Sequence, residues 1–168
     1  MNIRKLTAAA LMVAIGTLSA HLVYIPAGAS KCFPVQHAIN VLTAVLLGPK
    51  AAVTVAFAIS CLRNLLGTGS LLAFPGSMLG AGCAGLLYLR YQSVGAALAG
   101  EILGTGVLGA LAAGVLANLI LGSKAAAWFF VPPFIISTIG GSIIAGVLLK
   151  STLLSQFLPT IFPKGDKR

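Results

Sequence analysis

Residues 94–121 read VGAALAGEILGTGVLGALAAGVLANLIL and carry one charged side chain, that of Glu101. A helix that crosses a bilayer needs about 20 largely apolar residues, and this stretch exceeds that length. The stretch therefore predicts a membrane-spanning helix. Polar breaks bound it at residues 90–93 and 122–124, and similar apolar segments lie on both sides.

The composition of the whole chain agrees with this prediction. Of its 168 residues, 58% are apolar and 8% are charged, and the mean hydropathy is +1.05. Soluble domains carry about 25% charged residues, so a water-soluble globule is excluded. The length allows about six spans of this kind. We therefore expect an all-α integral membrane protein, a six-helix bundle that forms a single membrane domain over residues 1–168.

The breaks between the apolar segments define the expected spans. The first span resembles a secretory signal, but it is too long and lacks a clean cleavage site. The second is short, and joining it to the third would place Lys50 inside one helix beside a Gly-Pro break. Two short helices are therefore expected there. The six expected ranges are about 6–25, 33–47, 51–66, 71–89, 94–121 and 125–149.

The basic residues set the expected orientation. With the N-terminus in the cytoplasm, Lys31 and Lys124 fall outside and nearly all other basic residues fall inside, as the positive-inside rule requires. Both termini are then cytoplasmic, and residues 151–168 form a cytoplasmic tail. The net charge of +9 thus follows from topology, and no nucleic-acid partner is expected. The inside set is Arg4, Lys5, Lys50, Arg90, Lys150, Lys164, Lys167 and Arg168.

Polar side chains inside the spans indicate a binding site. Gln36 and Asn40 share one stripe of the second helix, and His37 lies on its flank. Arg63 and Asn64 end the third helix. In the expected orientation all five lie in the outer half of the membrane, with His21 and the loop at residues 67–70. Intramembrane polar groups are costly and mark cavities or partners, so we expect these side chains to meet in an external pocket.

Glu101 and Arg63 are the acidic and the basic residue left within predicted spans, so mutual neutralisation is one hypothesis. A carboxylate near a helix N-terminus, helped by the dipole, is an equal alternative for Glu101. Arg63 either reads a phosphate on a ligand or holds Glu101. Aromatic residues cluster at the same outer side, including Phe33, Phe74 and Trp128, and they form an interfacial belt or stack on a planar ligand.

Several other classes of protein are excluded. The chain has no metal-ligand set, no carboxylate pair for acid/base work and no ATP-binding motif, so we expect no cofactor and no enzymatic activity. Two strings match GxGxxG, at residues 80–85 and 104–109, but both lie in membrane-length apolar runs, where no strand precedes a helix. Small residues four apart instead favour close helix packing. Transport would therefore need an energy source other than ATP hydrolysis by this chain.

Four strings give the chain a family resemblance. They are FPVQHAINV at 33–41, RNLLGTG at 63–69, AFPGS at 73–77, and GE at 100–101 followed by GTG at 104–106. In this order they resemble the ThiW family, the substrate-binding S components of energy-coupling factor (ECF) vitamin transporters, which are assigned to the thiazole precursor of thiamine. The resemblance covers about residues 3 to 150.

The resemblance implies a partnership and a ligand. S components are six-helix proteins that present an Ala-x-x-x-Ala face on the first helix to a transmembrane T component, and Ala10 and Ala14 match that face. Internal packing within the chain is the alternative for this pair. Two cytoplasmic ATPases drive the assembly in the plasma membrane of a prokaryote. The implied ligand is hydroxyethylthiazole or a close thiazole analogue, with its phosphate, a pyrimidine precursor and thiamine left open. Expected ligand contacts are Gln36, His37, Asn40, Arg63, Asn64, Phe74, Trp128 and Glu101.

A second class of function stays open. A proton-coupled carrier of small solutes would work without an ATPase and would use Glu101 as its titrating group. Uptake without ATPase subunits that collapses with an uncoupler would favour that carrier over an ECF importer.

Overall fold

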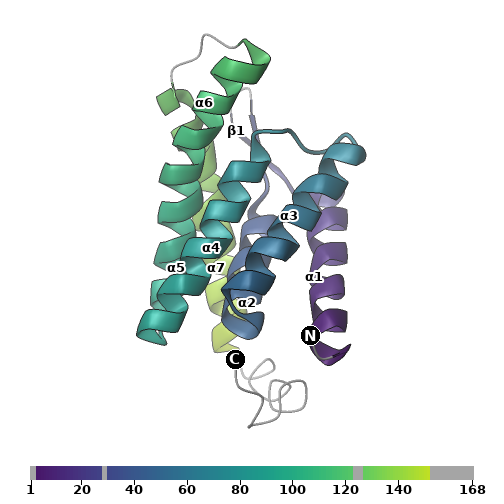
Figure 1. Cartoon of the computed structure of the whole chain (residues 1–168), viewed down its shortest axis with the longest axis vertical. Helices are drawn as coiled ribbons and strands as arrows, with labels where there is room; N and C mark the ends of the chain where they lie inside the picture. The colour runs from purple at the N-terminus through teal and green to yellow at the C-terminus, as the bar shows by residue number, and fades with distance from the viewer. Residues whose placement is uncertain (1–2, 28–29, 123–126, 152–168) are drawn as a thin grey trace.

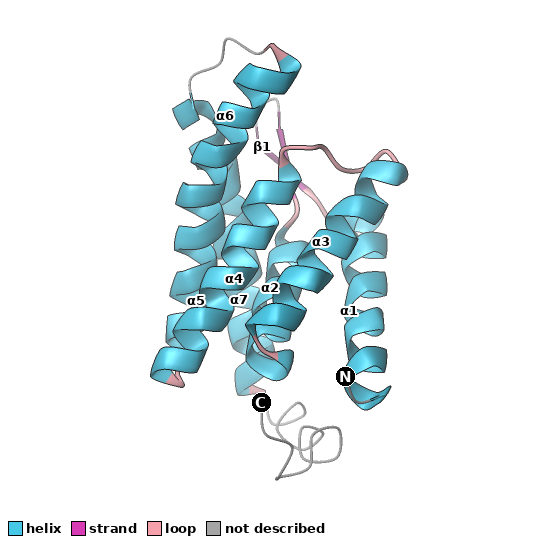
Figure 2. Cartoon of the chain, in the orientation of Figure 1, coloured by secondary structure: helices cyan, strands magenta, loops and turns pink. Residues whose placement is uncertain are grey.

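The computed structural model describes residues 3–27, 30–122 and 127–151, which form a bundle of helices that run up and down (Figures 1 and 2). This confirms the expected helical class. Both described ends of the chain lie at one end of the bundle (Figure 1). The helices are α1 (Ile3–Leu22), α2 (Pro34–Leu47), α3 (Pro49–Leu65), α4 (Ala73–Tyr91), α5 (Val94–Leu103), η1 (Gly104–Gly109), α6 (Ala110–Leu121), η2 (Ala127–Phe130) and α7 (Val131–Lys150).

The short helix α2 is the centre of the bundle. It packs against α1, α3, α4, α5 and α7, and most of its residues are buried, including Ile39 and Val41. A helix enclosed by longer neighbours contacts little lipid, so it does not need the full thickness of the bilayer. Gly48, at φ 89°, separates α2 from α3, and Pro49 starts α3. Two helices rather than one are therefore confirmed for this stretch.

Residues 94–121 form one continuous helix with a π-helical segment in its middle. α5 passes into the π-helical segment η1 and then into α6. At this segment the helix lies directly against α4, because a Cβ on Gly104 would stand 2.7 Å from the Cα of Gly80. The small residues of both GxGxxG strings thus serve helix packing. The π-turn was not predicted.

A β-hairpin replaces the end of the first predicted span. Strands β1 (Ile25–Ala27) and β2 (Ser30–Cys32) pair antiparallel, with Ile25 opposite Cys32. The predicted range of 6–25 is therefore wrong at both ends, because α1 starts at Ile3 and stops at Leu22. Pro26 lies in strand β1. Its fixed φ and its missing N–H do not suit a helix, which explains why the helix does not continue through it. The other helices begin and end within about two residues of their expected bounds, except that α7 starts at Val131 after the turn η2. The expected start at residue 125 and the tail after Ser151 lie outside the described residues.

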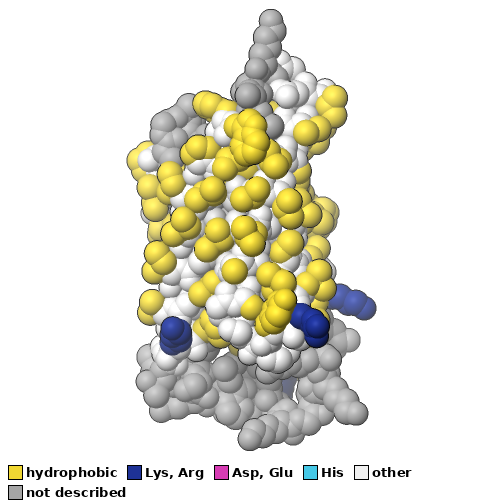
Figure 3. Space-filling model, turned by 90° about the vertical axis from the view of Figure 1, so that its left-hand side faces the viewer, with side chains coloured by type: hydrophobic (Ala, Val, Ile, Leu, Met, Phe, Trp, Pro, Cys, Tyr) yellow, Lys and Arg dark blue, Asp and Glu magenta, His cyan; other side chains and the backbone are white. Residues whose placement is uncertain are grey.

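The outer surface suits a membrane. Three helical stretches are long and apolar enough to cross one, namely Ile3–Leu22, Val94–Ile120 and Trp128–Lys150. Apolar side chains cover the face drawn in Figure 3, and its basic side chains gather at one end. The up-and-down order of the helices places Lys50, Arg90 and Lys150 at that end, with the described ends of the chain.

A candidate solute pocket at the end away from the termini

A cavity of about 580 Å³ opens at the end of the bundle opposite to the chain ends. The end of α1, the hairpin, the starts of α2, α4 and α7, the end of α3 and the loop between α3 and α4 all line it. Small-molecule sites have volumes of about 300–1,000 Å³, so the cavity has the size for one vitamin-sized ligand. Of the predicted site residues, it brings together Gln36, His37 and Arg63, and the predicted loop at 67–70 and His21 join them.

Aromatic rings form part of the wall. Tyr24, Phe33, Phe130 and Phe134 all line the cavity. The Nζ atom of Lys31 lies 4.7 Å from the centre of the Tyr24 ring. A wall of this kind offers flat apolar faces to a planar ring.

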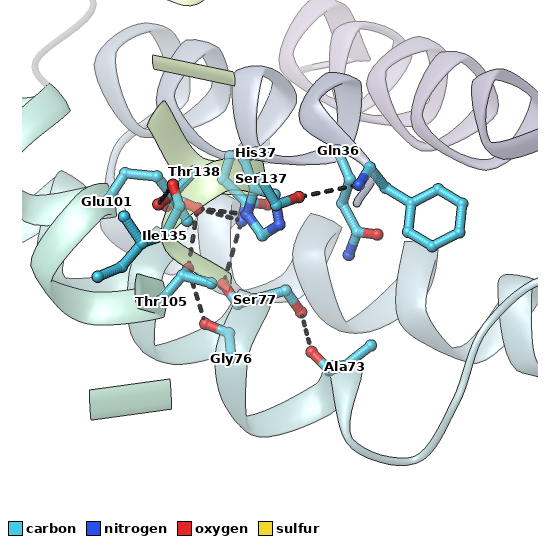
Figure 4. Close-up of polar contacts among 12 residues, drawn as sticks. Gln36, His37, Ala73, Gly76, Ser77, Glu101, Thr105, Ile135, Ser137 and Thr138 are labelled. Atoms are coloured by element: carbon cyan, nitrogen blue, oxygen red, sulfur yellow. Dashed lines mark hydrogen bonds and ion pairs between the residues drawn. The ribbon is translucent and has the colours of Figure 1, made fainter. Parts of the chain in front are cut away.

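A chain of buried hydrogen bonds runs from Gln36 to Ala73, and Figure 4 shows its last bond, between Ser77 and Ala73. The Gln36 amide nitrogen donates to Ser60 Oγ at 3.4 Å, and Ser60 and Ser77 join through their hydroxyls at 2.9 Å. Ser77 donates its own proton to the backbone oxygen of Ala73 at 2.9 Å, so Ser60 must be the donor to Ser77. This order fixes the Gln36 amide, whose oxygen then faces Arg63.

Arg63 is held on three sides. Its guanidinium donates to Gln36 Oε1 and, at 2.8 Å, to the backbone oxygen of Thr68, and it lies over the Phe33 ring at 3.8 Å from the centroid. The side chain is 3% exposed, and its Nε atom has no hydrogen-bond partner in the described residues. The backbone oxygen of Arg63 in turn accepts from the N–H groups of Thr68 and Gly69. Arg63 therefore fixes the loop that closes one side of the cavity.

His37 connects the cavity to a buried carboxylate (Figure 4). Its Nδ1 atom lies 2.8 Å from Glu101 Oε1. The same oxygen accepts from Asn40 Nδ2 at 3.1 Å and lies 2.9 Å from Thr105 Oγ1. Glu101 is fully buried, and its second oxygen has no partner among the described residues. Glu101 and Asn40 are absent from the cavity lining, and Glu101 orients the His37 ring through its Nδ1 atom.

The hypothesis that Arg63 neutralises Glu101 is wrong. Each has nearer partners: Arg63 bonds to Gln36 and Thr68, and Glu101 bonds to His37. The helices that carry the two residues, α3 and α5, both pack against α4. Counting residues along a helix gives the depth of a side chain but not the neighbour that it faces.

Three other expected contacts do not line the cavity. Asn64 donates from its amide to the backbone oxygens of Ser60 and Ser70, at 2.8 and 3.1 Å, and so stabilises the loop. Phe74 packs against Phe57 with the ring centres 5.7 Å apart. Trp128 is 69% exposed on the outer surface, as an interfacial tryptophan is.

Several residues of the cavity lining were missed in the sequence, among them two serines. Ser77 and Ser137 line it, and Ser137 Oγ accepts from the Phe33 N–H at 2.9 Å. Phe134 and Lys31 line it too. Helical serines usually bond back to their own helix, so their type alone gives no signal. For Phe134 the sequence offered one signal, since it directly follows Pro132-Pro133, and prolines are favoured in the first turn of a helix. The pair thus marks the start of α7, which lines the cavity.

The cysteine at the hairpin is structural. Cys32 is 1% exposed, and its Sγ donates to the backbone oxygen of Pro133 at 3.2 Å. Burial raises the pKa of the Cys32 thiol, so the thiol keeps its proton. It ties the hairpin to the start of α7 at the cavity wall.

A bundle of apolar helices with a cavity of ligand size and polar lining at one end is consistent with a membrane transporter of small molecules. A family model described as thiamine-precursor transporter protein (ThiW) matches residues 6–155. The chain therefore belongs to the ThiW family, and it is a transporter rather than an enzyme. No curated protein and no solved structure matches it.

Proposed function

We propose that this chain is the substrate-binding component of an ECF importer and captures the thiazole precursor of thiamine. The cavity carries this proposal, because it combines an aromatic wall with fixed polar groups and has room for a ligand of this size. Hydroxyethylthiazole has about nine non-hydrogen atoms, which at the ceiling of about −1.5 kcal/mol each permit nanomolar affinity. The ring lies against Phe33, Phe130 or Phe134, and the polar groups bond to Gln36 and His37.

The proposed orientation places the cavity outside and both termini in the cytoplasm, with six membrane spans. The position of the basic residues supports it. Lys50, Arg90 and Lys150 lie at the end of the bundle away from the cavity, and an excess of Lys and Arg marks the cytoplasmic side. A plasma membrane of a prokaryote is the proposed location.

The first helix is the proposed docking face for the T component, with two ATPases below it. Of its most apolar stretch, 17% is buried within the chain, and both Ala10 and Ala14 are exposed. Small residues on a free face let another helix approach closely. Replacing both with Leu is expected to block uptake but not ligand binding. Ala99→Leu, an exposed alanine on α5, is the matched control, and loss of uptake in both variants would contradict the docking role.

Isothermal titration of the purified protein tests the substrate. Hydroxyethylthiazole is expected to bind with submicromolar affinity and to compete successfully against hydroxymethylpyrimidine and thiamine. The described lining contains the cations Lys31 and Arg63 and no carboxylate, which disfavours the permanently cationic thiamine. Tighter binding of either competitor would contradict the assignment.

One observation favours the second candidate, a proton-coupled carrier. Glu101 is fully buried, yet it reaches the cavity through His37, as a proton relay would require. Proteoliposomes that hold this chain alone separate the two functions. Under an imposed inward proton gradient, an importer component binds ligand there without accumulating it, whereas a carrier accumulates it until an uncoupler is added.

A further inference from the structure

The charge of Arg63 has no anionic partner in the described part of the chain. The guanidinium is 3% exposed, and both of its hydrogen-bond acceptors are neutral, an amide oxygen and a backbone oxygen. The described carboxylate, that of Glu101, is bonded elsewhere. A buried charge without a counter-charge is expensive, so this arrangement calls for an anion from outside the chain.

Arg63 also has donors to offer. A guanidinium carries five N–H groups in a planar fork, and two of them are used by Gln36 Oε1 and the Thr68 oxygen. The Nε–H is buried and unpartnered. Because Arg63 lines the cavity and the Phe33 ring fixes its plane, the fork is pre-organised for a phosphate or carboxylate group.

The rest of the cavity has the same sign of charge. Lys31 lies at its rim, and the described lining contains no Asp or Glu. Clefts lined by one sign of charge attract ligands of the opposite sign. A neutral ligand would use the aromatic wall but would leave Arg63 uncompensated.

We propose that the cavity holds an anion subsite at Arg63 and that its ligand carries a phosphate group, so that the phosphate ester of hydroxyethylthiazole binds more tightly than the neutral alcohol. This inference rests on the proposed function. A phosphate ester carries about −1.5 to −2 charges at pH 7. Its ring contacts the aromatic wall while its phosphate accepts from the Arg63 fork, with Lys31 as the second cation.

Titration of the whole purified chain with the alcohol and with its phosphate ester tests the subsite. The ester is expected to bind at least about 10-fold more tightly, which corresponds to about 1.4 kcal/mol. Arg63→Gln is expected to reduce this ratio to about one. Lys31→Gln, at the exposed rim, should reduce the ratio of the two affinities by about two- to threefold. This variant replaces Arg63→Gln as the test if Arg63→Gln fails to fold.

Lys50→Gln is the matched control, since it removes one positive charge from the exposed far end of the same helix, about 20 Å from Arg63 at 1.5 Å per residue. It should leave the ratio unchanged. Equal or weaker binding of the ester in the wild type would overturn the subsite while leaving thiazole capture intact. Inorganic phosphate that strengthens binding of the alcohol would overturn it too, because the anion would then be separate from the ligand. Failure of both thiazoles to bind would instead refute the proposed function.

Discussion

Replacing Glu101 tests whether the buried carboxylate positions His37 for the ligand. In Glu101→Leu, three groups lose their contact with Oε1: His37 Nδ1, Asn40 Nδ2 and Thr105 Oγ1. Asn40 retains the Ser77 oxygen and Thr105 retains the Gly76 oxygen. Of the three, only His37 retains no other side-chain partner among the described residues.

The expected cost follows from this count. One donor left unpaired costs about 1–3 kcal/mol, so Glu101→Leu should destabilise the protein by about that amount. The freed imidazole no longer keeps one tautomer or one orientation, and affinity for hydroxyethylthiazole should fall by about 10-fold or more. Glu101→Gln retains an acceptor at the position of Oε1, so it should recover most of the affinity.

Isothermal titration and thermal unfolding in one detergent measure both effects. A purely structural role would change the unfolding temperature in proportion to lost packing and would not distinguish Gln from Leu in affinity. Full affinity and an unchanged unfolding temperature in Glu101→Leu would refute the reasoning.

Three more predictions concern close contacts and strain. Gly80→Ala should lower the thermal stability and the affinity strongly, because its Cβ would stand 1.9 Å from Thr105 Oγ1. Gly82→Ala, whose Cβ would have its nearest contact at 3.5 Å, should change neither quantity. The same titration and melting experiments measure both variants. Gly48→Ala should destabilise by about 1–3 kcal/mol because its φ of 89° suits glycine alone, which a denaturation series against wild type measures. The Cys32 thiol should resist alkylation at neutral pH and react faster as the pH rises, because burial raises its pKa. Mass spectrometry of labelled native and unfolded protein measures the alkylation rate of this thiol in both states. Equal rates in the two states would contradict the prediction.

The helical architecture was predictable because its causes are local in the sequence. Apolar length and polar breaks define where spans begin and end, and the Gly48-Pro49 step separates two helices by backbone conformation alone. The four-residue spacing of small residues also predicted close helix packing, and Gly80 of α4 and Gly104 of η1 make such a contact.

The candidate site was predictable only in part, because its contacts depend on how helices rotate against one another. The polar stripe of α2 correctly predicted that Gln36 and His37 line the cavity. Helical rise gave the depth of Glu101 but not its partner, His37. Phe74 and Trp128 lie at the expected end of the bundle, yet their rings turn away from the cavity. The π-turn after Glu101 widens the helix there, and no local pattern announces it.

The central claim is that the cavity opens to the outside and captures the thiazole. Labelling of intact cells with a membrane-impermeant maleimide tests it on Ser70→Cys, an exposed residue of the cavity rim, and on Lys50→Cys, an exposed residue at the opposite end. Above the wild-type background, the account predicts labelling of Ser70→Cys, protection of that site by the bound thiazole, and no labelling of Lys50→Cys. Labelling of Lys50→Cys alone, or labelling of Ser70→Cys that no thiazole reduces, would contradict it.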